Sequence, residues 1–349
     1  MKKKMIAFAA CCVCFLMVCA VLSSCGKQKN KYSSYSFDYF DTVTTITGYA
    51  VEKEEFDLVC EEIFALLAEY HKLFTIYERY DGLVNLRTVN TAHETVAVDE
   101  KIVDLLLYAK EMYTLTKGEM NIAMGSVLSI WHEYRELGME SVQSAELPPM
   151  DALTKAATHT DIDSLVIDKD AGTVTLTDSE MTLDVGAIAK GYAVEMVAQM
   201  LEEKGICGYV LNVGGNVRTI GTKADGEKWL VGIENPLDDG DPYIEYLSLA
   251  GESLVTSGSY QRYYLVDGNS YHHIIDRDTL MPAEGYRSVS VICRSSADGD
   301  ALSTALFCMP FEEGLALAES LEGVEVMWVF PDGEKRYSSG FSAYIADIG

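Results

Sequence analysis

Residues 183–221 read LDVGAIAKGYAVEMVAQMLEEKGICGYVLNVGGNVRTIG, and this stretch organises the predicted fold. A strand predicted at 181–185 leads into a turn of small residues, and a helix with apolar residues at helical spacing then ends at Lys204-Gly205. A second predicted strand, 209–213, runs into Gly214-Gly215-Asn216. Paired glycines let two backbone segments approach closely, so we expect this turn to lie against another part of the chain.

The turn at 186–191 combines small residues, a lysine at position 190 and the start of a helix. Unpaired N–H groups and the helix dipole favour an anion at such a start, which indicates a phosphate site. An ordinary strand-to-helix connection, in which the glycines only permit tight packing, explains the pattern equally well. The turn has neither the spacing of the dinucleotide fingerprint G-x-G-x-x-G nor that of the P-loop.

The N-terminal residues have the features of a lipoprotein signal. Three lysines precede an apolar run at 5–22, and Leu22-Ser23-Ser24-Cys25 has the residue order of a bacterial lipoprotein cleavage site. This predicts a signal peptide at 1–24, a lipidated tether at 25–36 and a folded domain at 37–349. A transmembrane helix is the alternative, but a polar segment follows the apolar run. We therefore expect a protein lipid-anchored at Cys25 to the cell membrane, facing outside the cytoplasm.

The chain is strongly acidic, with a net charge of −27 that becomes −30 when the predicted signal peptide removes three lysines and no acids. This charge argues against binding to nucleic acid or to an anionic membrane surface by general electrostatics. An anionic ligand would need local donors or a metal ion, which favours a divalent cation. The cysteines beyond residue 25 are widely spaced without a CxxC pair, and we expect buried free thiols at Cys60, Cys207, Cys293 and Cys308.

Hydrophobic periodicity predicts helices first and then mostly strands. Helices are expected at 54–74, 100–116, 126–137, 300–307 and 312–321. Strands are expected at 41–51, 229–233, 246–249, 262–266, 270–275, 287–293 and 325–330, with a hairpin of 173–177 and 181–185 around 178–180. This order of elements predicts an α+β or layered α/β architecture.

Three polar clusters contain residues that a core does not need. In residues 271–276, YHHIID, strand alternation places the two histidines on opposite faces, although a histidine on an apolar strand is structural more often than catalytic. Asp300 and Thr304 lie at i and i+4 at a helix start, so their oxygens can face one point and suit Mg²⁺. Simple capping by Asp298 or Asp300 is the plainer explanation. Residues 256–262, TSGSYQR, form a hydroxyl-rich turn that could equally be a plain entry to a strand.

Five motifs occur in the order, and at about the spacings, of the ApbE family, which the chain resembles from about residue 37 to 330. Members of this family are FAD:protein FMN transferases, often periplasmic or surface lipoproteins. The motifs are DVGAIAKG at 184–191, GGN at 214–216, TSG at 256–258, HIID at 273–276 and DALST at 300–304. The resemblance implies ApbE-like, T-fold-like mixed sheets with flanking helices.

The resemblance also implies a Mg²⁺-dependent enzyme that splits the pyrophosphate of FAD, releases AMP and joins FMN by a phosphoester bond to a threonine or serine of a partner protein. The metal would be held by the backbone oxygen of Ala187 and the side chains of Asp300 and Thr304, with Lys190 near the phosphates. His273 would act as the base toward the acceptor hydroxyl, because an unperturbed imidazole titrates near pH ~6.5. The FAD pocket would include Phe40, Thr75, Ile76, Tyr77, Asn121, Ser257 and Ile274.

The chain departs from the family pattern at three places. Phe40-Asp41-Thr42 stands where members commonly have Met-Gly-Thr, Asn121 stands where many have aspartate, and residues 276–280, DRDTL, replace Asp-Pro-x-Thr-Gly. These changes concern the contacts to the flavin and adenine rings more than the reaction. Two other functions fit the sequence, namely hydrolysis of FAD to FMN and AMP with water as acceptor, and non-catalytic flavin binding in the cell envelope.

Overall fold

The computed structural model describes residues 28–92, 94–141, 145–237 and 240–347. The predicted signal peptide at 1–24 and the predicted lipidation site Cys25 lie outside these residues. In the described part of the chain, no helix has the combination of length and apolar composition that crossing a membrane requires.

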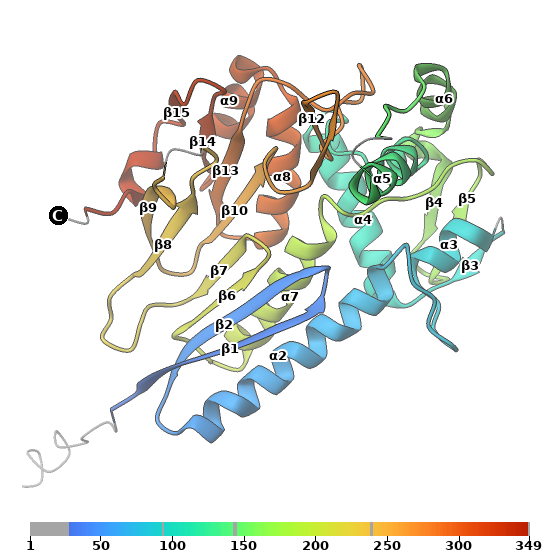
Figure 1. The fold of residues 1–349 in the computed structure, drawn as a ribbon. Helices are drawn as coiled ribbons and strands as arrows, with labels where there is room; N and C mark the ends of the chain where they lie inside the picture. Colours follow the sequence, from blue (N-terminus) through green and yellow to red (C-terminus); the bar gives the residue numbers. More distant parts are fainter. Residues whose placement is uncertain (1–27, 93, 142–144, 238–239, 348–349) are drawn as a thin grey trace, which may run out of the picture.

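An antiparallel sheet of eight strands forms the centre of the described structure (Figure 1). Its strands, in spatial order, are β1 (Asn30–Tyr39), β2 (Thr42–Ala50), β6 (Tyr209–Val213), β7 (Asn216–Ile220), β10 (Ser253–Gly258), β13 (Ser288–Cys293), β14 (Glu325–Val329) and β15 (Lys335–Tyr337). Fully buried residues alternate with more accessible ones along β2, because only one face of this outer part of the sheet is well covered. Every residue of the central strand β13 is buried, because both faces are covered there.

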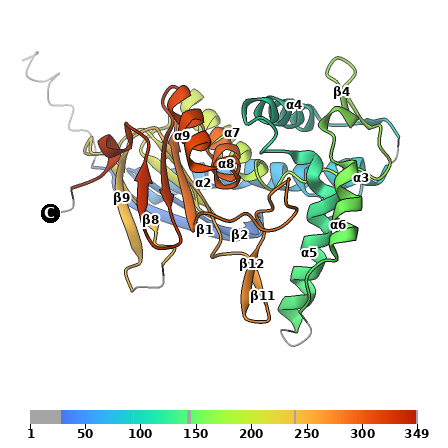
Figure 2. The same ribbon diagram turned by 90° about the horizontal axis from the view of Figure 1, so that it is seen from above.

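Helices cover one face of the sheet, as Figure 2 shows from above. They are α2 (Lys53–Phe74), α7 (Ala189–Glu203), α8 (Ser296–Cys308) and α9 (Phe311–Ser320). Helix α8 packs on β10 and β13 and against α7, so most of its residues are buried. The largest hydrophobic cluster lies between these helices and the sheet and fixes their positions.

A two-stranded ribbon covers the other face of the sheet. It consists of β8 (Trp229–Glu234) and β9 (Tyr243–Leu249). Leu247 and Leu249 of the ribbon pack with Leu254 and Ile292 of the sheet in a separate buried cluster. The sheet is therefore the middle one of three layers, which confirms the predicted α+β architecture. All strand pairings that the structure describes are antiparallel, so its sheets are not mixed in strand direction.

A smaller region lies at the end of the helix layer, on the right in Figure 2. Its helices are α3 (Leu86–Ala92), α4 (Glu100–Leu115), α5 (Gly125–Glu140) and α6 (Met150–Ala156), with 3₁₀ turns η1 (Ile122–Met124), η3 (Ala157–His159) and η4 (Ile162–Ser164). Its small sheet has the order β3 (Val96–Ala97), β5 (Thr173–Leu176), β4 (Leu165–Asp168). A hairpin of β11 (Tyr263–Val266) and β12 (Asn269–His272) packs along α5. A last 3₁₀ turn, η5 (Phe341–Tyr344), follows β15.

The hairpin predicted for 173–177 and 181–185 is wrong. Strand β5 pairs with β3 and β4 instead, and 181–185 forms no strand. The Asn90 side chain accepts a 2.8 Å hydrogen bond from Leu183 N and donates a 2.9 Å bond to Leu183 O. A single amide side chain thus satisfies the backbone groups that a neighbouring strand would otherwise pair with.

Three smaller expectations also change. Strand β1 begins at Asn30 and pairs with β2, so the expected tether at 25–36 belongs to the sheet from residue 30 onward. The strand predicted at 270–275 ends at His272 because Ile274 N bonds to the His272 ring instead of a neighbouring strand. The four cysteines are free thiols as expected, but only Cys60 and Cys293 are buried, since Cys207 is exposed and Cys308 is partly buried.

Candidate active site

The first turns of α7 and α8 meet at Gly191. A Cβ atom on Gly191 would lie 2.3 Å from Ser296 O and 2.4 Å from Asp300 Cβ, so only glycine permits this approach. Gly191 N donates a 2.7 Å hydrogen bond to Asp300 Oδ2. Gly191 lies in the first turn of α7, where backbone N–H groups have no partner within the helix, and Asp300 supplies the acceptor for this one.

Lys190 lies beside the same carboxylate. Its Nζ is 3.6 Å from Asp300 Oδ1 and donates to Asn216 Oδ1, which follows the glycine turn between β6 and β7. That turn lies against another segment as predicted, since a Cβ on Gly214 would be 2.3 Å from Thr42 Oγ1. Burial lowers the pKa of the Lys190 ammonium, and the charge of Asp300 opposes this shift. The lysine is therefore a desolvated cation with one carboxylate partner, which suits it to a second anion.

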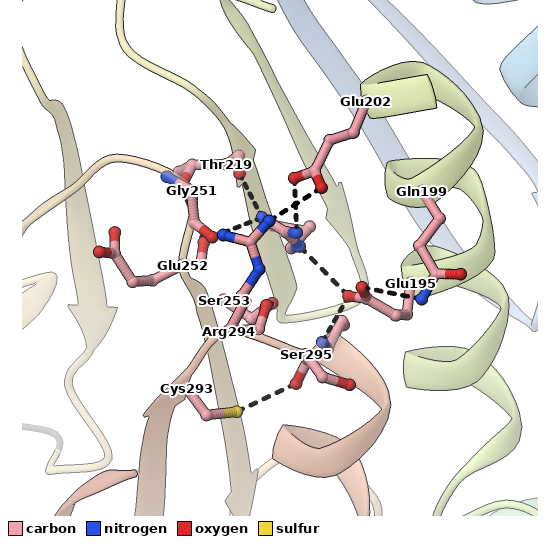
Figure 3. A network of polar contacts seen from close by, with 12 residues as sticks. Glu195, Gln199, Glu202, Thr219, Gly251, Glu252, Ser253, Cys293, Arg294 and Ser295 are labelled. Carbon is pink, nitrogen blue, oxygen red and sulfur yellow. Dashed lines mark hydrogen bonds and ion pairs between the residues drawn. The ribbon is translucent and has the colours of Figure 1, made fainter. Parts of the chain in front are cut away.

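A buried charge network fixes α8 against α7 (Figure 3). Glu195 Oε2 on α7 accepts hydrogen bonds from Ser296 N at the start of α8 (2.9 Å) and from Arg218 Nε (3.2 Å). Arg218 is fully buried and also donates to Glu202 Oε1 at 2.9 Å. Glu202 in turn accepts from Arg294, as the labelled side chains in Figure 3 show. These contacts set the position of the helix turn that carries Asp300.

Hydroxyl groups connect β10 to α8 about one helical turn after Asp300. Ser257 Oγ lies 3.2 Å from Thr304 Oγ1 and 2.9 Å from Ser303 Oγ. Asp300 and Thr304 are on the same helix at the predicted i and i+4 spacing, and Asp300 is only 5% exposed. The TSG motif therefore lies directly against the DALST motif, as a shared site requires.

His273 directly follows β12 and lies in a different setting from His272. The His272 ring donates from Nε2 to Ala283 O at 2.9 Å and accepts from Ile274 N, so its role is structural. The His273 Nδ1 lies 3.3 Å from Arg262 O, and because a carbonyl only accepts, Nδ1 carries the proton. Burial, with the charges of Arg262 and Arg135, lowers the pKa of His273 to about 3. Its Nε2 is therefore unprotonated at neutral pH.

Two adjoining cavities bring the predicted residues together. The first, which we name the α5 cavity, is lined by α5, β12 and the turn that precedes α7. It includes Tyr77, Asn121, Ala187, Ser257, His273, Ile274 and Thr304. The second, which we name the α2 cavity, lies at the C-terminal end of α2 and includes Phe40, Thr75, Ile76, Tyr77 and Lys190. Asp300 lines neither cavity. It contacts Lys190, which lines the α2 cavity, and it lies on the same helix as Thr304, which lines the α5 cavity.

Four residues line both cavities and mark where they meet. They are Tyr77, Asp184, Gly186 and Arg262. Asp184 accepts a 2.8 Å hydrogen bond from Gly186 N, and burial raises the pKa of its carboxyl. A long ligand with two ring systems could occupy both cavities and pass across this junction.

Sequence reasoning missed several residues that line the cavities. Asp184 and Arg262 lie within motifs that were recognised, the first at the start of DVGAIAKG and the second at the end of TSGSYQR. His132 and Arg135 lie on α5. Polar residues at this spacing are typical of the solvent-facing side of an amphipathic helix, so the sequence did not mark them as cavity residues. Their contribution to the α5 cavity depends on the packing of α5 beside the β11–β12 hairpin.

The donor atoms near Asp300 suit a hard cation. The described residues contain no cluster of three or more His, Cys, Asp or Glu side chains that could hold a metal ion. A cation here would instead use oxygens of three kinds, namely the backbone carbonyl of Ala187, the Asp300 carboxylate and the Thr304 hydroxyl. Such an all-oxygen set fits Mg²⁺, which keeps several waters and shares its shell with phosphates, and it does not fit a softer metal.

The model of the ApbE family matches residues 40–328, which include both cavities and the α7–α8 contact. This chain belongs to the ApbE family. A Treponema pallidum protein named FAD:protein FMN transferase is 31% identical over 94% of this chain and 92% of its own length. A Vibrio cholerae protein of the same name is 31% identical over 82% of this chain and 84% of its own length.

Solved ApbE structures share the fold of this chain. The ApbE protein of Thermotoga maritima superposes with a TM-score of 0.80 at 27% identity, covering 91% of this chain and all of that one. The flavin transferase ApbE of Vibrio cholerae superposes with a TM-score of 0.75 at 26% identity, covering 90% and 99%. The family assignment made from the five sequence motifs is confirmed.

Two departures from the ApbE pattern have local structural explanations. Phe40 and Asp41 adopt positive φ angles of 54° and 51° at the β1–β2 turn, so Asp41 replaces the usual glycine in a left-handed conformation that aspartate tolerates. Phe40 N also donates to His71 Nδ1 at 3.1 Å, which holds the turn against α2. Asn121 caps η1 by accepting from Ala123 N and donates to Thr160 O, a donation that an ionised aspartate could not make.

Proposed function

We propose that this protein transfers FMN from FAD to a threonine or serine hydroxyl of an acceptor protein, forming a phosphoester bond and releasing AMP. Membership of the ApbE family and relatives named FAD:protein FMN transferase support a transferase that acts on FAD. The observation that carries the proposal is the pair of adjoining cavities, because residues of four of the five recognised motifs line them. The α5 cavity and the α2 cavity would each receive one end of FAD, leaving the pyrophosphate beside Lys190 and Ala187.

We propose that Mg²⁺ is held by Ala187 O, Asp300 and Thr304. When bound, the cation neutralises phosphate charge and helps to orient the reacting groups. The chain itself prepares this arrangement, because Gly191 N orients the Asp300 carboxylate and Ser257 orients the Thr304 hydroxyl. Lys190 supplies a fixed positive charge to the phosphates, which a chain of net charge −27 needs locally.

His273 is our candidate for the general base. Its Nδ1–H donates to Arg262 O, so Nε2 is free to accept the proton of the acceptor hydroxyl. The hydroxyl oxygen then forms a bond to the FMN phosphorus, and the bond from that phosphorus to the bridging oxygen breaks. The electron pair and the bridging oxygen leave with AMP, and His273 passes the proton on to solvent. Replacement of His273 by Ala is expected to remove transfer, and retention of full activity would exclude this role.

The proposed reaction is tested with purified protein, FAD, Mg²⁺ and a candidate acceptor with a surface threonine. The expected products are AMP and a flavin-fluorescent acceptor band that survives denaturing electrophoresis. AMP with free FMN and no labelled acceptor would identify a FAD pyrophosphatase. Bound FAD without AMP would identify a flavin carrier, and both of those results would overturn the proposal. An acceptor whose threonine is changed to valine is the matched control.

We also propose that residues 1–24 are a signal peptide and that lipid on Cys25 anchors the enzyme to the outer side of a membrane. The residue order Leu22-Ser23-Ser24-Cys25 supports this proposal. The short distance along the chain from Cys25 to Asn30, where β1 begins, would keep the folded part close to the membrane. Cys25→Ser should move the protein from the membrane fraction to the soluble fraction and abolish palmitate incorporation. An unchanged distribution would contradict the anchor.

A further inference from the structure

Arg262 lies at the junction of the two cavities, between the end of β10 and the start of β11. Its backbone carbonyl accepts from both the N–H and the ring Nδ1 of His273, at 3.1 and 3.3 Å. The backbone of Arg262 is therefore fixed by the residue proposed as the base. Its guanidinium is available to a ligand, because the described residues include no carboxylate within ion-pairing distance of it.

The position of Arg262 matters because of the shape of FAD, and the argument rests on the proposed function. FAD has its flavin and its adenine at opposite ends and its pyrophosphate in the middle. A molecule that fills both cavities must pass its middle across the residues common to both, which are Tyr77, Asp184, Gly186 and Arg262. Arg262 is the one cation in that set of four. A second cation, Lys190 in the first turn of α7, lines the α2 cavity but not the α5 cavity.

We propose that the Arg262 guanidinium binds the pyrophosphate of FAD and stabilises the phosphate that leaves with AMP. Its planar fork of N–H donors matches two phosphate oxygens at once. As the phosphorus–oxygen bond breaks, the bridging oxygen gains the electron pair and leaves as part of AMP. Arg262 donates N–H groups to this phosphate, so the developing negative charge is met by a fixed positive group.

The charges around the junction support this assignment. Arg135 also lacks a carboxylate partner among the described residues, and its NH2 group contacts His132 Nδ1 at 2.7 Å. Burial lowers the pKa of Arg135, and the charge of Arg262 adds to the effect. Arg135, Arg262 and Asp184 all line the α5 cavity, so two like charges share this space with one carboxyl group. An anion bound at the junction would relieve the repulsion between the two arginines.

The test compares ligands that differ in their phosphates. Arg262→Ala should weaken FAD binding, measured by quenching of flavin fluorescence, by about 10-fold to 100-fold, the range for loss of hydrogen bonds to a charged group. Riboflavin, which has no phosphate, should bind as it does to the wild type. Arg262→Lys should recover part of the FAD affinity, because lysine keeps the charge but loses the two-point contact. The matched control is Arg287→Ala, at an exposed arginine outside both cavities.

The outcomes separate this inference from the proposed function. If the wild type transfers FMN but Arg262→Ala and Arg262→Lys both bind FAD with wild-type affinity, the assignment of Arg262 is wrong. An equal loss of FAD and riboflavin affinity would also overturn it, because that result indicates a damaged cavity. If the wild type binds FAD but forms no flavinylated protein, the proposed transfer fails while the role of Arg262 in FAD binding can still be read from its variants.

Discussion

Glu195 Oε2 lies 2.9 Å from the backbone nitrogen of Ser296, so an acid on α7 holds the first turn of α8. The same oxygen is 3.2 Å from Arg218 Nε, which reaches it from β7. Asp300 follows Ser296 by about one helical turn. The direction of the proposed cation ligand therefore depends on a buried charge pair that lines neither cavity.

Arg218→Met is expected to lower the free energy of unfolding by about 3–5 kcal/mol, because it leaves Glu195 buried without its counter-charge. Urea denaturation measures this change. Arg294→Met is the control, since Arg294 is an exposed partner of Glu202 and its loss should cost less than about 1 kcal/mol. Equal effects of the two substitutions would show that the buried pair does not stabilise the helix contact.

Gly191→Ala should lower stability by about 1–3 kcal/mol and also reduce transfer, because the new methyl group would push Ser296 and Asp300 away. Gly314→Ala in α9 is the control. A Cβ atom at position 314 would lie 3.3 Å from the flexible Leu306 side chain, so the free energy of unfolding should change by less than about 1 kcal/mol. Urea denaturation and the transfer assay are applied to both variants. Wild-type stability in Gly191→Ala would mean that the two helices can separate without cost.

Asp300→Asn should abolish the response to Mg²⁺ while keeping the fold. The amide oxygen can still accept from Gly191 N, but the charge that attracts a cation is lost. Mg²⁺ should raise the melting temperature of the wild type by mass action and leave that of the variant unchanged. Asp298→Asn is the control, since Asp298 accepts from Tyr108 OH and lines neither cavity. An undiminished Mg²⁺ response in Asp300→Asn would remove Asp300 from the proposed metal site.

His273 makes stability depend on pH in a predictable direction. Its pKa is lowered to about 3 in the folded protein from 6.5, so between these values the unfolded chain binds more protons. The free energy of unfolding should therefore fall as the pH drops from 6.5 toward 3, by up to about 1.4 kcal/mol per pH unit. His273→Asn should lose less stability than the wild type between pH 7 and pH 5 in urea denaturation without FAD. Parallel losses would show that the pKa of His273 is not lowered in the folded protein.

The sequence predicted those parts of the fold in which local periodicity and packing agree. Helices α2, α4, α5 and α9 lie within a few residues of their predicted ranges, because each has an apolar stripe at helical spacing. Periodicity failed at 181–185, where apolar alternation is typical of a strand. There the backbone is held by the Asn90 side chain, from a residue far away in the sequence, and no local pattern records such a contact.

Some residues of the candidate site could likewise be predicted from the sequence, and others could not. The motifs around Lys190, Ser257, His273 and Asp300 could be recognised from the sequence because each has a characteristic local order of residues. Asp184 and Arg262 were within reach of that reasoning, but their importance comes from lining both cavities, which is a property of the assembled structure. His132 and Arg135 could not be found, since a charged residue on an amphipathic helix has the same local pattern whether it faces solvent or a cavity.

The sequence by itself determined the family, the acidic character and the chemical groups available for catalysis, because these depend on residue identity and spacing. The tertiary structure decided which groups act together. The approach of α7 to α8 at Gly191 gives a first-turn N–H its acceptor on Asp300. The packing of β10, β12 and α5 places Arg262 at the junction of two cavities. Both results follow from contacts between distant segments, whose energies depend on distance and burial in the folded chain.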